Sequence, residues 1–285
     1  MTRQRRTKRF DKTNYLTIFK DTLDRTEKSK DSIIYYEEDI ITNLSEESEI
    51  IFEKNDCITV ALRESYSGKV CLLNNASDLC PGGNVTKKNG SQRDRYCHKT
   101  KLYKNLNEGD ICRRTNLYKN IIDHKNLYYF DILDKNCAKN NLIPQFKYLN
   151  YQIMLELENY KPFALFSPEI SIIKDENYEL IKEQKNISVI TYAPIRNPVF
   201  LNGEYDEYHY NIMDKKIKML LFIAKENNID TLILVAWGCV GFNNPIHQVA
   251  KLFKENLKNT YFKKVIFAIN DEYMLEKFKT EFNSD

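Results

Sequence analysis

Residues 231–245 read TLILVAWGCVGFNNP, and this stretch decides the fold class. Its first seven residues are an apolar run of the length of a buried strand, and Gly238 and Gly241 follow at once. The next segment, 245–257, has the apolar spacing of a helix and starts with a proline, which suits the first turn of a helix. Strand, glycine loop and helix in this order predict a parallel sheet with a loop at the carboxyl end of the strand.

The same alternation continues on both sides of this stretch. Apolar runs predict strands over 32–36, 58–62, 69–74, 162–173, 187–193 and 264–269. Helical spacing predicts helices over 12–29, 140–159, 212–226 and 272–282. Residues 75–125 hold little apolar periodicity and read as a long functional loop region with short helices. The chain is therefore predicted to be an α/β protein.

The composition limits the class of partner. The chain has 285 residues, of which 42% are hydrophobic, so it can build a core. Its 43 basic and 40 acidic residues nearly balance, which argues against a surface that binds nucleic acid as a whole. No apolar run approaches the about 18 residues of a membrane span, so no membrane partner is expected.

Basic residues gather at the start of the chain, in an arm over residues 1–11. No apolar run follows them, so the arm is not a secretory signal. A flexible tail is the plainer interpretation, and a contact with nucleic acid or an acidic partner is the alternative. The basic residues are Arg3, Arg5, Arg6, Lys8 and Arg9.

The cysteines and histidines predict neither disulfides nor a metal site. The seven cysteines include no C-x-x-C pair, which favours reduced thiols and a cytoplasmic location, with the nucleus or the cytosol of a host cell as alternatives. The four histidines have no metal spacing, and no cofactor is expected. They are His98, His124, His209 and His247.

A second glycine loop follows the strand predicted over 69–74 and reads PGGN over 81–84. Ligands of open α/β sheets bind beyond the carboxyl ends of the strands, where both loops would lie. A helix amino terminus offers free N–H groups to a diphosphate, and glycines allow close approach of the backbone. The sequence has no G-x-G-x-x-G after the first strand and no G-x-x-x-x-G-K-[ST], which disfavours a dinucleotide dehydrogenase and a P-loop NTPase.

An internal repeat lies beside this second loop. Residues 97–105, CHKTKLYKN, are echoed by residues 112–120, CRRTNLYKN. Two similar short amphipathic helices explain the repeat, and a basic face toward an anionic ligand is the alternative.

Residues 73–84, LNNASDLCPGGN, followed by Gln92-Arg93-Asp94 and Cys97, resemble the microbial-type poly(ADP-ribose) glycohydrolases. That family has the pattern N-F-A-S-x-x-x-P-G-G-G, then Q-E-E, then L-C-R-R-S-x-L-Y. Residues 166–169, 189–194 and 236–245 are similar to its Y-S-P-D, V-I-T-x-A-P and A-W-G-C-G-x-F-G-N-x-P, so the resemblance covers about residues 20–270. It implies a three-layer α/β/α macrodomain with a mixed central sheet. It also implies ADP-ribose as the ligand and hydrolysis of an ADP-ribosyl bond.

The domain is predicted over 12–285 as a single macrodomain and a monomer, with 12–50 as a helical extension packed on it.

The resemblance also implies which residues form the site. Asn74 is a candidate for binding the distal ribose, with strand-end capping as the alternative. Phe242 is a candidate for packing on that ribose, with ordinary core packing as the alternative. The remaining candidates for binding ADP-ribose are Gly82, Gly83, Asn84, Gln92, Arg93, Gly238, Cys239, Val240, Gly241 and Asn243.

The sequence departs from the family at the catalytic pair, where Arg93-Asp94 stands in place of Glu-Glu. Asp94 keeps a carboxylate on a stem shorter by one methylene. A carboxyl group can protonate the leaving group at the ribose C1″ and then help water attack, so Asp94 is the predicted catalytic residue. Asp110 is a second carboxylate near the repeat that is expected to share this task. Asn84, Val240 and Asn243 stand where the family has glycines.

Arg93 bears on the substrate. A cation beside Asp94 favours its ionised form, which suits a base or a partner for a cationic leaving group such as a guanidinium. The predicted function is therefore removal of ADP-ribose from modified protein, with arginine-linked mono-ADP-ribose, such as on ubiquitin, as the favoured substrate. A poly(ADP-ribose) glycohydrolase and a non-catalytic reader of ADP-ribose are the alternatives.

Overall fold

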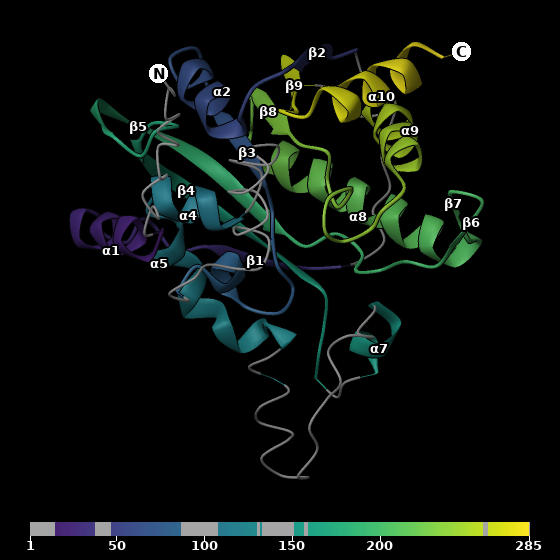
Figure 1. The fold of residues 1–285 in the computed structure, drawn as a ribbon, viewed down its shortest axis with the longest axis horizontal. Helices are drawn as coiled ribbons and strands as arrows, with labels where there is room; N and C mark the ends of the chain where they lie inside the picture. Colours follow the sequence, from purple (N-terminus) through teal and green to yellow (C-terminus); the bar gives the residue numbers. More distant parts are fainter. Residues whose placement is uncertain are drawn as a thin grey trace, which may run out of the picture.

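The computed structural model describes residues 15–37, 47–86, 108–129, 132, 151–156, 159–258 and 262–284. A seven-stranded sheet runs through them in the order β1-β4-β5-β3-β8-β9-β2 (Figure 1). Strands β5, β3, β8, β9 and β2 are parallel, and β4 pairs antiparallel with both β5 and β1. The strands are β1 (Ile33–Tyr36), β2 (Glu49–Glu53), β3 (Val70–Asn75), β4 (Phe163–Lys174), β5 (Leu180–Tyr192), β8 (Thr231–Leu234) and β9 (Lys264–Ala268). A separate hairpin joins β6 (Phe200–Leu201) to β7 (Glu204–Tyr205).

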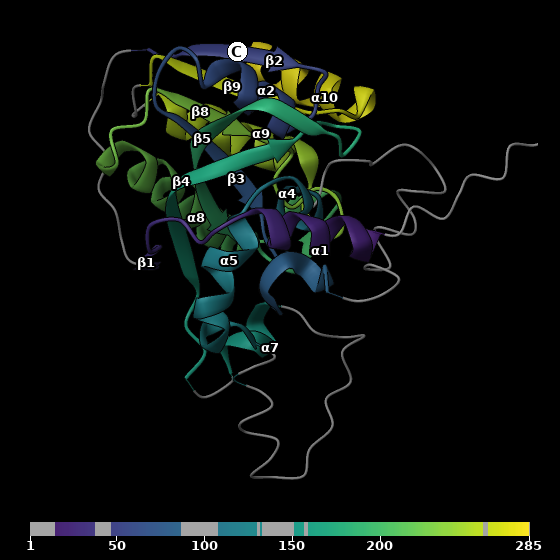
Figure 2. The same ribbon diagram turned by 90° about the vertical axis from the view of Figure 1, so that its left-hand side faces the viewer.

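Helices cover both faces of the sheet (Figures 1 and 2). The side chains of β3 alternate between the two faces. Cys71 and Leu73 pack toward α8, α9 and α10. Val70 and Leu72 pack toward α1, α2, α4 and α5 on the other face. A strand buried on both faces needs an unbroken apolar run, which β3 has. The helices are α1 (Tyr15–Arg25), α2 (Cys57–Glu64), α4 (Glu108–Arg114), α5 (Leu117–Ile121), α7 (Tyr151–Leu155), α8 (Glu207–Glu226), α9 (Ile246–Leu257) and α10 (Glu272–Asn283), with 3-10 turns η1 (Pro81–Asn84) and η2 (Ile122–Leu127).

The predicted three-layer α/β/α fold with a mixed sheet is confirmed. One strand prediction is wrong, because residues 58–62 lie in helix α2. The Asp56 side chain caps this helix by accepting the backbone amides of Ile58 and Thr59, and the capped apolar run packs against the sheet as a helix. Strand β2 was not predicted.

A helical extension is predicted over 12–50, but this range also contributes strands to the central sheet. Helix α1 packs on α4, and Lys174 of β4 anchors it by donating to the carbonyl of Ile18 and to the hydroxyl of Thr22. Strand β1 forms one edge of the sheet, and β2 starts at the end of this range on the opposite edge. The basic arm over 1–11 lies outside the described residues.

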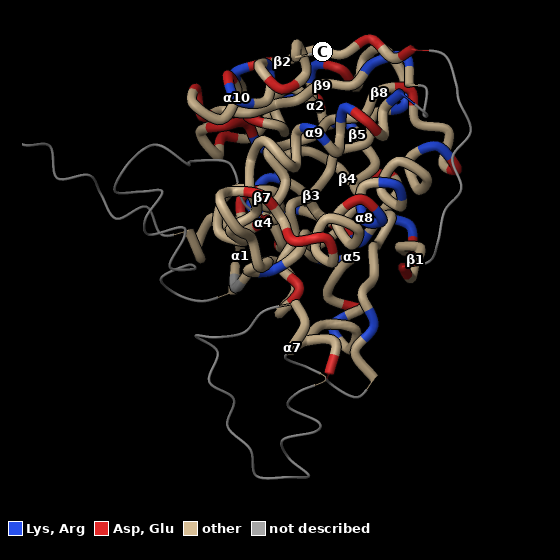
Figure 3. Tube along the Cα trace, turned by 90° about the vertical axis from the view of Figure 1, so that its right-hand side faces the viewer, with Lys and Arg blue, Asp and Glu red and all other residues tan. Residues whose placement is uncertain are grey.

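Charges are dispersed over the described part of the chain. Figure 3 shows acidic and basic positions interspersed along α8, α9 and α10. Within that same part of the chain, no helix combines the length and the apolar character needed to cross a bilayer.

Candidate functional site

The first loop follows β3 and contains η1. We call residues 76–86 loop 1. Gly82 and Gly83 have φ of +70° and +57°, a region that favours glycine. A Cβ on Gly82 would lie 2.7 Å from Val85 Cγ1 and 2.9 Å from Tyr118 Cδ2. Both predicted glycines therefore shape the backbone of loop 1, and Gly82 also allows its close packing.

Glu108, the first residue of α4, lies at the foot of loop 1. Its side chain is 3% exposed, and its Oε2 accepts the backbone amide of Ser77 at 2.9 Å. The amide of Gly82 also donates to the carboxyl group, and Asn74 Nδ2 lies 3.4 Å from Oε1. Burial raises the pKa of Glu108 to about 7, against the effect of the hydrogen bonds from Ser77 and Gly82. At neutral pH this carboxyl group can hold or release a proton.

Asn74 ends the central strand beside Glu108. It is fully buried, and its Nδ2 also donates to Thr191 Oγ1 of β5 at 3.3 Å. Its Oδ1 accepts no hydrogen bond from the residues that the structure describes. A buried amide oxygen without a donor is unusual, so Asn74 offers an acceptor at the carboxyl end of the sheet.

The second loop lies between β8 and α9. We call residues 235–245 loop 2. Gly238, Gly241 and Asn243 have φ of +76°, +84° and +63°. Asparagine tolerates this region better than other residues with a side chain, so Asn243 keeps the backbone shape of the glycine that it replaces. Val240 keeps a negative φ. Gly241 and Asn243 are exposed, and Val240 is half-buried.

A neutral side chain braces loop 2 from inside. The buried Asn244 donates to the carbonyls of Ile195 at 2.8 Å and Gly238 at 3.2 Å, and its Oδ1 accepts the hydroxyl of Tyr205 at 2.7 Å. A Cβ on Gly238 would lie 2.5 Å from Asn244 Nδ2, so the glycine is needed for this brace.

Other residues of loop 2 face the protein interior. Phe242 is 4% exposed, and its ring lies under the guanidinium of Arg196, with 4.8 Å from Cζ to the ring centroid. Cys239 is half-buried, and its Sγ lies 3.7 Å from the carbonyl of Trp237. Burial raises the pKa of this thiol, so Cys239 is a poor nucleophile. Helix α9 starts directly after loop 2, with Pro245 at its N-cap.

Asp110 lies on another side of α4 from Glu108. It is 2% exposed and accepts the hydroxyl of Tyr178 at 2.5 Å, and its Oδ2 lies 3.5 Å from Arg114 Nη1. Arg114 is also paired with Asp56 at 2.7 Å. Burial raises the pKa of Asp110, although Arg114 and Tyr178 oppose this effect. The structure thus brings Glu108, rather than Asp110, to loop 1.

Three predicted site residues, Gln92, Arg93 and Asp94, lie outside the described residues, as does the side chain of Asn84. The catalytic role of Asp94 therefore stays a prediction.

Glu108 is not among the site residues predicted from the sequence, although the internal repeat contains a pattern that points to it. Gln92-Arg93-Asp94 starts five residues before Cys97, and Asn107-Glu108-Gly109 starts five residues before Cys112. The second copy, C-R-R-T-N-L-Y, also matches the family's C-R-R-S-x-L-Y better than the first copy, C-H-K-T-K-L-Y. In this register Glu108 corresponds to the first Glu of Q-E-E, and Gly109 corresponds to the second.

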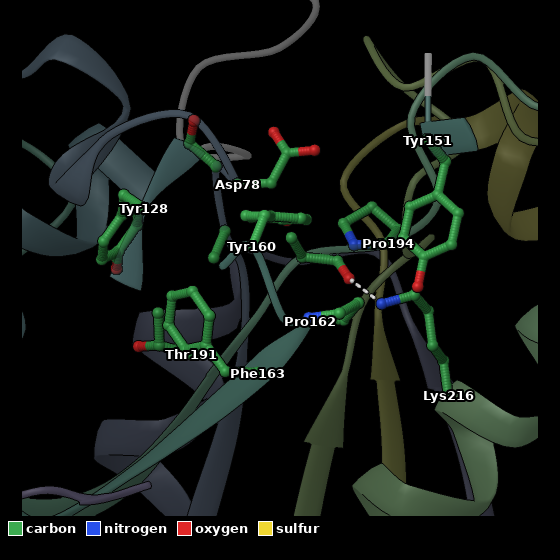
Figure 4. A pocket seen from close by; sticks show the side chains of 12 residues that line it. Asp78, Tyr128, Tyr151, Tyr160, Pro162, Phe163, Thr191, Pro194 and Lys216 are labelled. Atoms are coloured by element: carbon green, nitrogen blue, oxygen red, sulfur yellow. Dashed lines mark hydrogen bonds between the residues drawn. The ribbon is translucent and has the colours of Figure 1, made fainter. Parts of the chain in front are cut away.

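A cavity opens beside loop 1, between the ends of β3 and β5 (Figure 4). Aromatic rings and Lys216 line it, and Lys216 Nζ donates to the carbonyl of Ala193 at 3.2 Å. The cavity has room for about one water molecule, so it is too small for a nucleotide. The aromatic residues are Tyr128, Tyr151, Tyr160 and Phe163.

The three-layer sandwich, the mixed sheet and the two glycine loops after β3 and β8 match the macrodomain fold that the sequence resemblance implies. Solved structures agree. The X-ray structure of the poly(ADP-ribose) glycohydrolase from Thermomonospora curvata, also solved bound to the inhibitor ADP-HPD, has a TM-score of 0.67 over 94% of this chain and 99% of that chain, at 16% identity. The poly(ADP-ribose) glycohydrolase from Deinococcus radiodurans in complex with ADP-ribose has a TM-score of 0.61 over 85% and 86%, at 20% identity. The chain therefore has the fold of these glycohydrolases.

No protein-family model and no curated protein matches the sequence.

Proposed function

We propose that the chain is an ADP-ribosyl hydrolase that removes ADP-ribose from modified protein. The observation that carries this proposal is the buried carboxyl group of Glu108, held by loop 1 next to Asn74. Cleavage at the ribose C1″ passes through an oxocarbenium-like state and needs a group that can give and take a proton. A carboxyl group with a pKa of about 7 can do both at neutral pH.

Two carboxyl groups compete for this catalytic role. Asp94 is the candidate from the sequence, where Arg93 favours its ionised form and hence action as a base. Glu108 is the candidate among the described residues, where burial favours the protonated form and hence action as an acid. The register of the internal repeat supports Glu108 as the counterpart of the first Glu of the family's pair, and it leaves Gly109, which has no carboxyl group, in place of the second.

We further propose that the linkage differs from the family's usual one. A site that has Asp94 where a second Glu is usual has shortened the reach of that carboxyl group by about one bond length, and a site that has Gly109 there has lost the carboxyl group. Arginine-linked mono-ADP-ribose on a protein such as ubiquitin is the favoured substrate, since a guanidinium pairs well with carboxylates.

A release assay tests this function. Arginine-linked, serine-linked and acidic-residue-linked mono-ADP-ribose and the polymer would each be offered to the wild type, to Asp94→Asn and to Glu108→Gln. We expect release from the arginine linkage, with a loss of about 100-fold or more in the variant that lacks the acid. Release from the polymer alone would instead identify a poly(ADP-ribose) glycohydrolase. Equal release by both variants and the wild type would remove both carboxyl groups from the mechanism.

A reader that binds ADP-ribose without chemistry is the second candidate. It is favoured by the hydrogen bonds that already hold the Glu108 carboxyl group to Ser77 and Gly82. Binding of ADP-ribose in calorimetry, with no release from any of the four substrates, would select the reader.

We propose a reducing compartment, the cytoplasm, and a monomer. The five cysteines in the described part of the chain are free thiols, which supports such a compartment.

A further inference from the structure

An ion pair joins loop 1 to the segment that follows β5. Arg196 Nε donates to Asp78 Oδ1 at 2.9 Å and lies 3.0 Å from Oδ2, and Nη2 also reaches Oδ1. The side chains of Asp78 and Arg196 are 3% and 16% exposed. A guanidinium fork on a carboxylate fixes both distance and orientation, and burial protects it from screening by salt.

The same guanidinium holds loop 2. Its Cζ lies 4.8 Å from the ring centroid of Phe242, and the backbone amide of the next residue, Asn197, donates to the carbonyl of Phe242 at 2.9 Å. Arg196 is thus held between a carboxylate of loop 1 and an aromatic ring of loop 2. We call Asp78, Arg196 and Phe242 the clamp.

Further contacts anchor the clamp at its back. The carbonyl of Asp78 accepts the amide of Tyr129 at 3.0 Å, and the carbonyl of Arg196 accepts the amide of Tyr151, at the start of α7, at 3.0 Å. The clamp is therefore tied to the body of the domain.

We infer that Arg196 is a positioning residue, and that the clamp fixes loop 2 relative to loop 1 and so sets the affinity for a ligand with a diphosphate. This inference rests on the proposed function, because ADP-ribose is the ligand that must reach both loops at once. The charge of Arg196 is neutralised by Asp78 and its face is covered by Phe242, so it acts through the loops rather than on the ligand. Preorganised loops bind more tightly because less ordering is left for the ligand to bring about.

Four variants separate a clamp from a direct ligand contact. Asp78→Asn weakens the clamp but leaves a cationic Arg196 for any anion. Arg196→Lys keeps the cation but loses the fork and the planar stack. Arg196→Met removes both. The matched control is Lys264→Met, which breaks the pair of Lys264 with Glu64 (2.8 Å, side chains 30% and 9% exposed) between β9 and α2, on strand β9 rather than at the loops.

The readouts are the Kd for ADP-ribose in calorimetry and hydrogen exchange of the amides of residues 77–83 and 238–244. We expect Asp78→Asn and Arg196→Met each to raise Kd by about tenfold and to speed exchange in both loops by about tenfold. The double variant Asp78→Asn/Arg196→Met should bind ADP-ribose no more weakly than Arg196→Met alone. Arg196→Lys should recover little of the affinity, and Lys264→Met should leave Kd and loop exchange as in the wild type.

Other results would overturn the clamp. Unchanged or tighter binding by Asp78→Asn, or full recovery by Arg196→Lys, would make Arg196 a direct contact of the ligand. Exchange that stays slow in either loop of Arg196→Met would also reject the clamp. A wild type that does not bind ADP-ribose would reject the proposed function instead, and loop exchange would still decide on the clamp.

Discussion

Loops 1 and 2 both contain glycines with positive φ, but different side chains brace them. Each follows a strand of the sheet and contains two glycines with positive φ. Loop 1 is held by a carboxyl group from outside the loop, Glu108, whereas loop 2 is held by its own neutral amide, Asn244. An amide makes the same hydrogen bonds at every pH in the physiological range, but the hydrogen bonds of Glu108 depend on its proton. Loop 2 is therefore a fixed support, whereas the hydrogen bonds that hold loop 1 change with the protonation of Glu108.

The largest expected loss of stability comes from a substitution in loop 2 that displaces the Asn244 brace. Gly238→Ala forces a side chain into a left-handed backbone and onto Asn244 Nδ2, 2.5 Å from the new Cβ. We expect a loss of about 4 kcal/mol in the free energy of unfolding, measured in urea. Gly203→Ala is the control, since Gly203 has φ of +86° but its Cβ would meet only His247 Cε1, at 3.5 Å. It should cost about 1 kcal/mol. Equal costs for the two variants would show that Asn244 is not a tight brace.

The next effect tests the titratable loop. The pKa of Glu108 is raised from 4.5 to about 7 in the folded chain, so the folded state holds a proton that the unfolded state has released between these values. Glu108 should therefore lower stability by an amount on the order of 3 kcal/mol as pH rises from about 4.5 to about 7. Glu108→Gln should remove this slope when urea unfolding is compared with the wild type at several pH values.

Glu64→Gln provides the control of opposite sign. Burial raises the pKa of Glu64, but hydrogen bonds from Lys264 and Arg63 outweigh burial and lower it overall. Glu64 should thus stabilise the fold above its ordinary pKa, with a loss as pH falls. A Glu108→Gln variant with the wild-type pH slope would contradict the assignment of a raised pKa.

A smaller effect separates Glu108 from Asp110. Asp110→Asn removes a buried charge that faces Arg114, so we expect a loss of about 2 kcal/mol in the free energy of unfolding. ADP-ribose binding at a temperature where the variant is folded should not change. A Kd raised as much as in Glu108→Gln would instead bring Asp110 into the ligand site.

The smallest expected change in stability concerns the backbone of loop 2 at Asn243. Asn243→Val places a β-branched residue at φ of +63° and should cost about 1.5 kcal/mol, whereas Asn243→Gly should stay within about 0.5 kcal/mol of the wild type. Thermal unfolding measures both. An unchanged unfolding temperature in Asn243→Val would mean that the backbone of loop 2 relaxes at this position.

The central sheet could be predicted from the sequence because its strands are buried on both faces. The runs at β3, β8 and β9 are continuous and apolar, whereas Ser167-Pro168-Glu169 interrupts the run at β4, and the structure confirms all four strands. Residues 58–62 are equally apolar, but a run of five is compatible with strand or helix, and only the cap by Asp56 favours the helix. Edge strand β2 was missed because its flanking glutamates hide a short apolar core.

The glycine loops could likewise be predicted, since few residues replace glycine at positive φ. Glu108 could not be recognised by its neighbours alone, because its burial depends on loop 1 folding over it. The repeat gave two registers for the catalytic segment, and sequence spacing to loop 1 favoured the first copy. Asp78 and Arg196, 118 residues apart, show no pattern that would pair them.

Strands β1 and β2 are close in the sequence, yet they form the two opposite edges of the sheet. Ile33 pairs with Phe166, and Ile50 pairs with Val265. During synthesis the partner of β2 is made 215 residues after β2 itself, since Glu49 pairs with Lys264. Such distant pairings slow folding and leave apolar strands open to aggregation. We expect this domain to complete its sheet only after β9 has been synthesised, and to depend on chaperones more than an α/β domain built from neighbouring pairs.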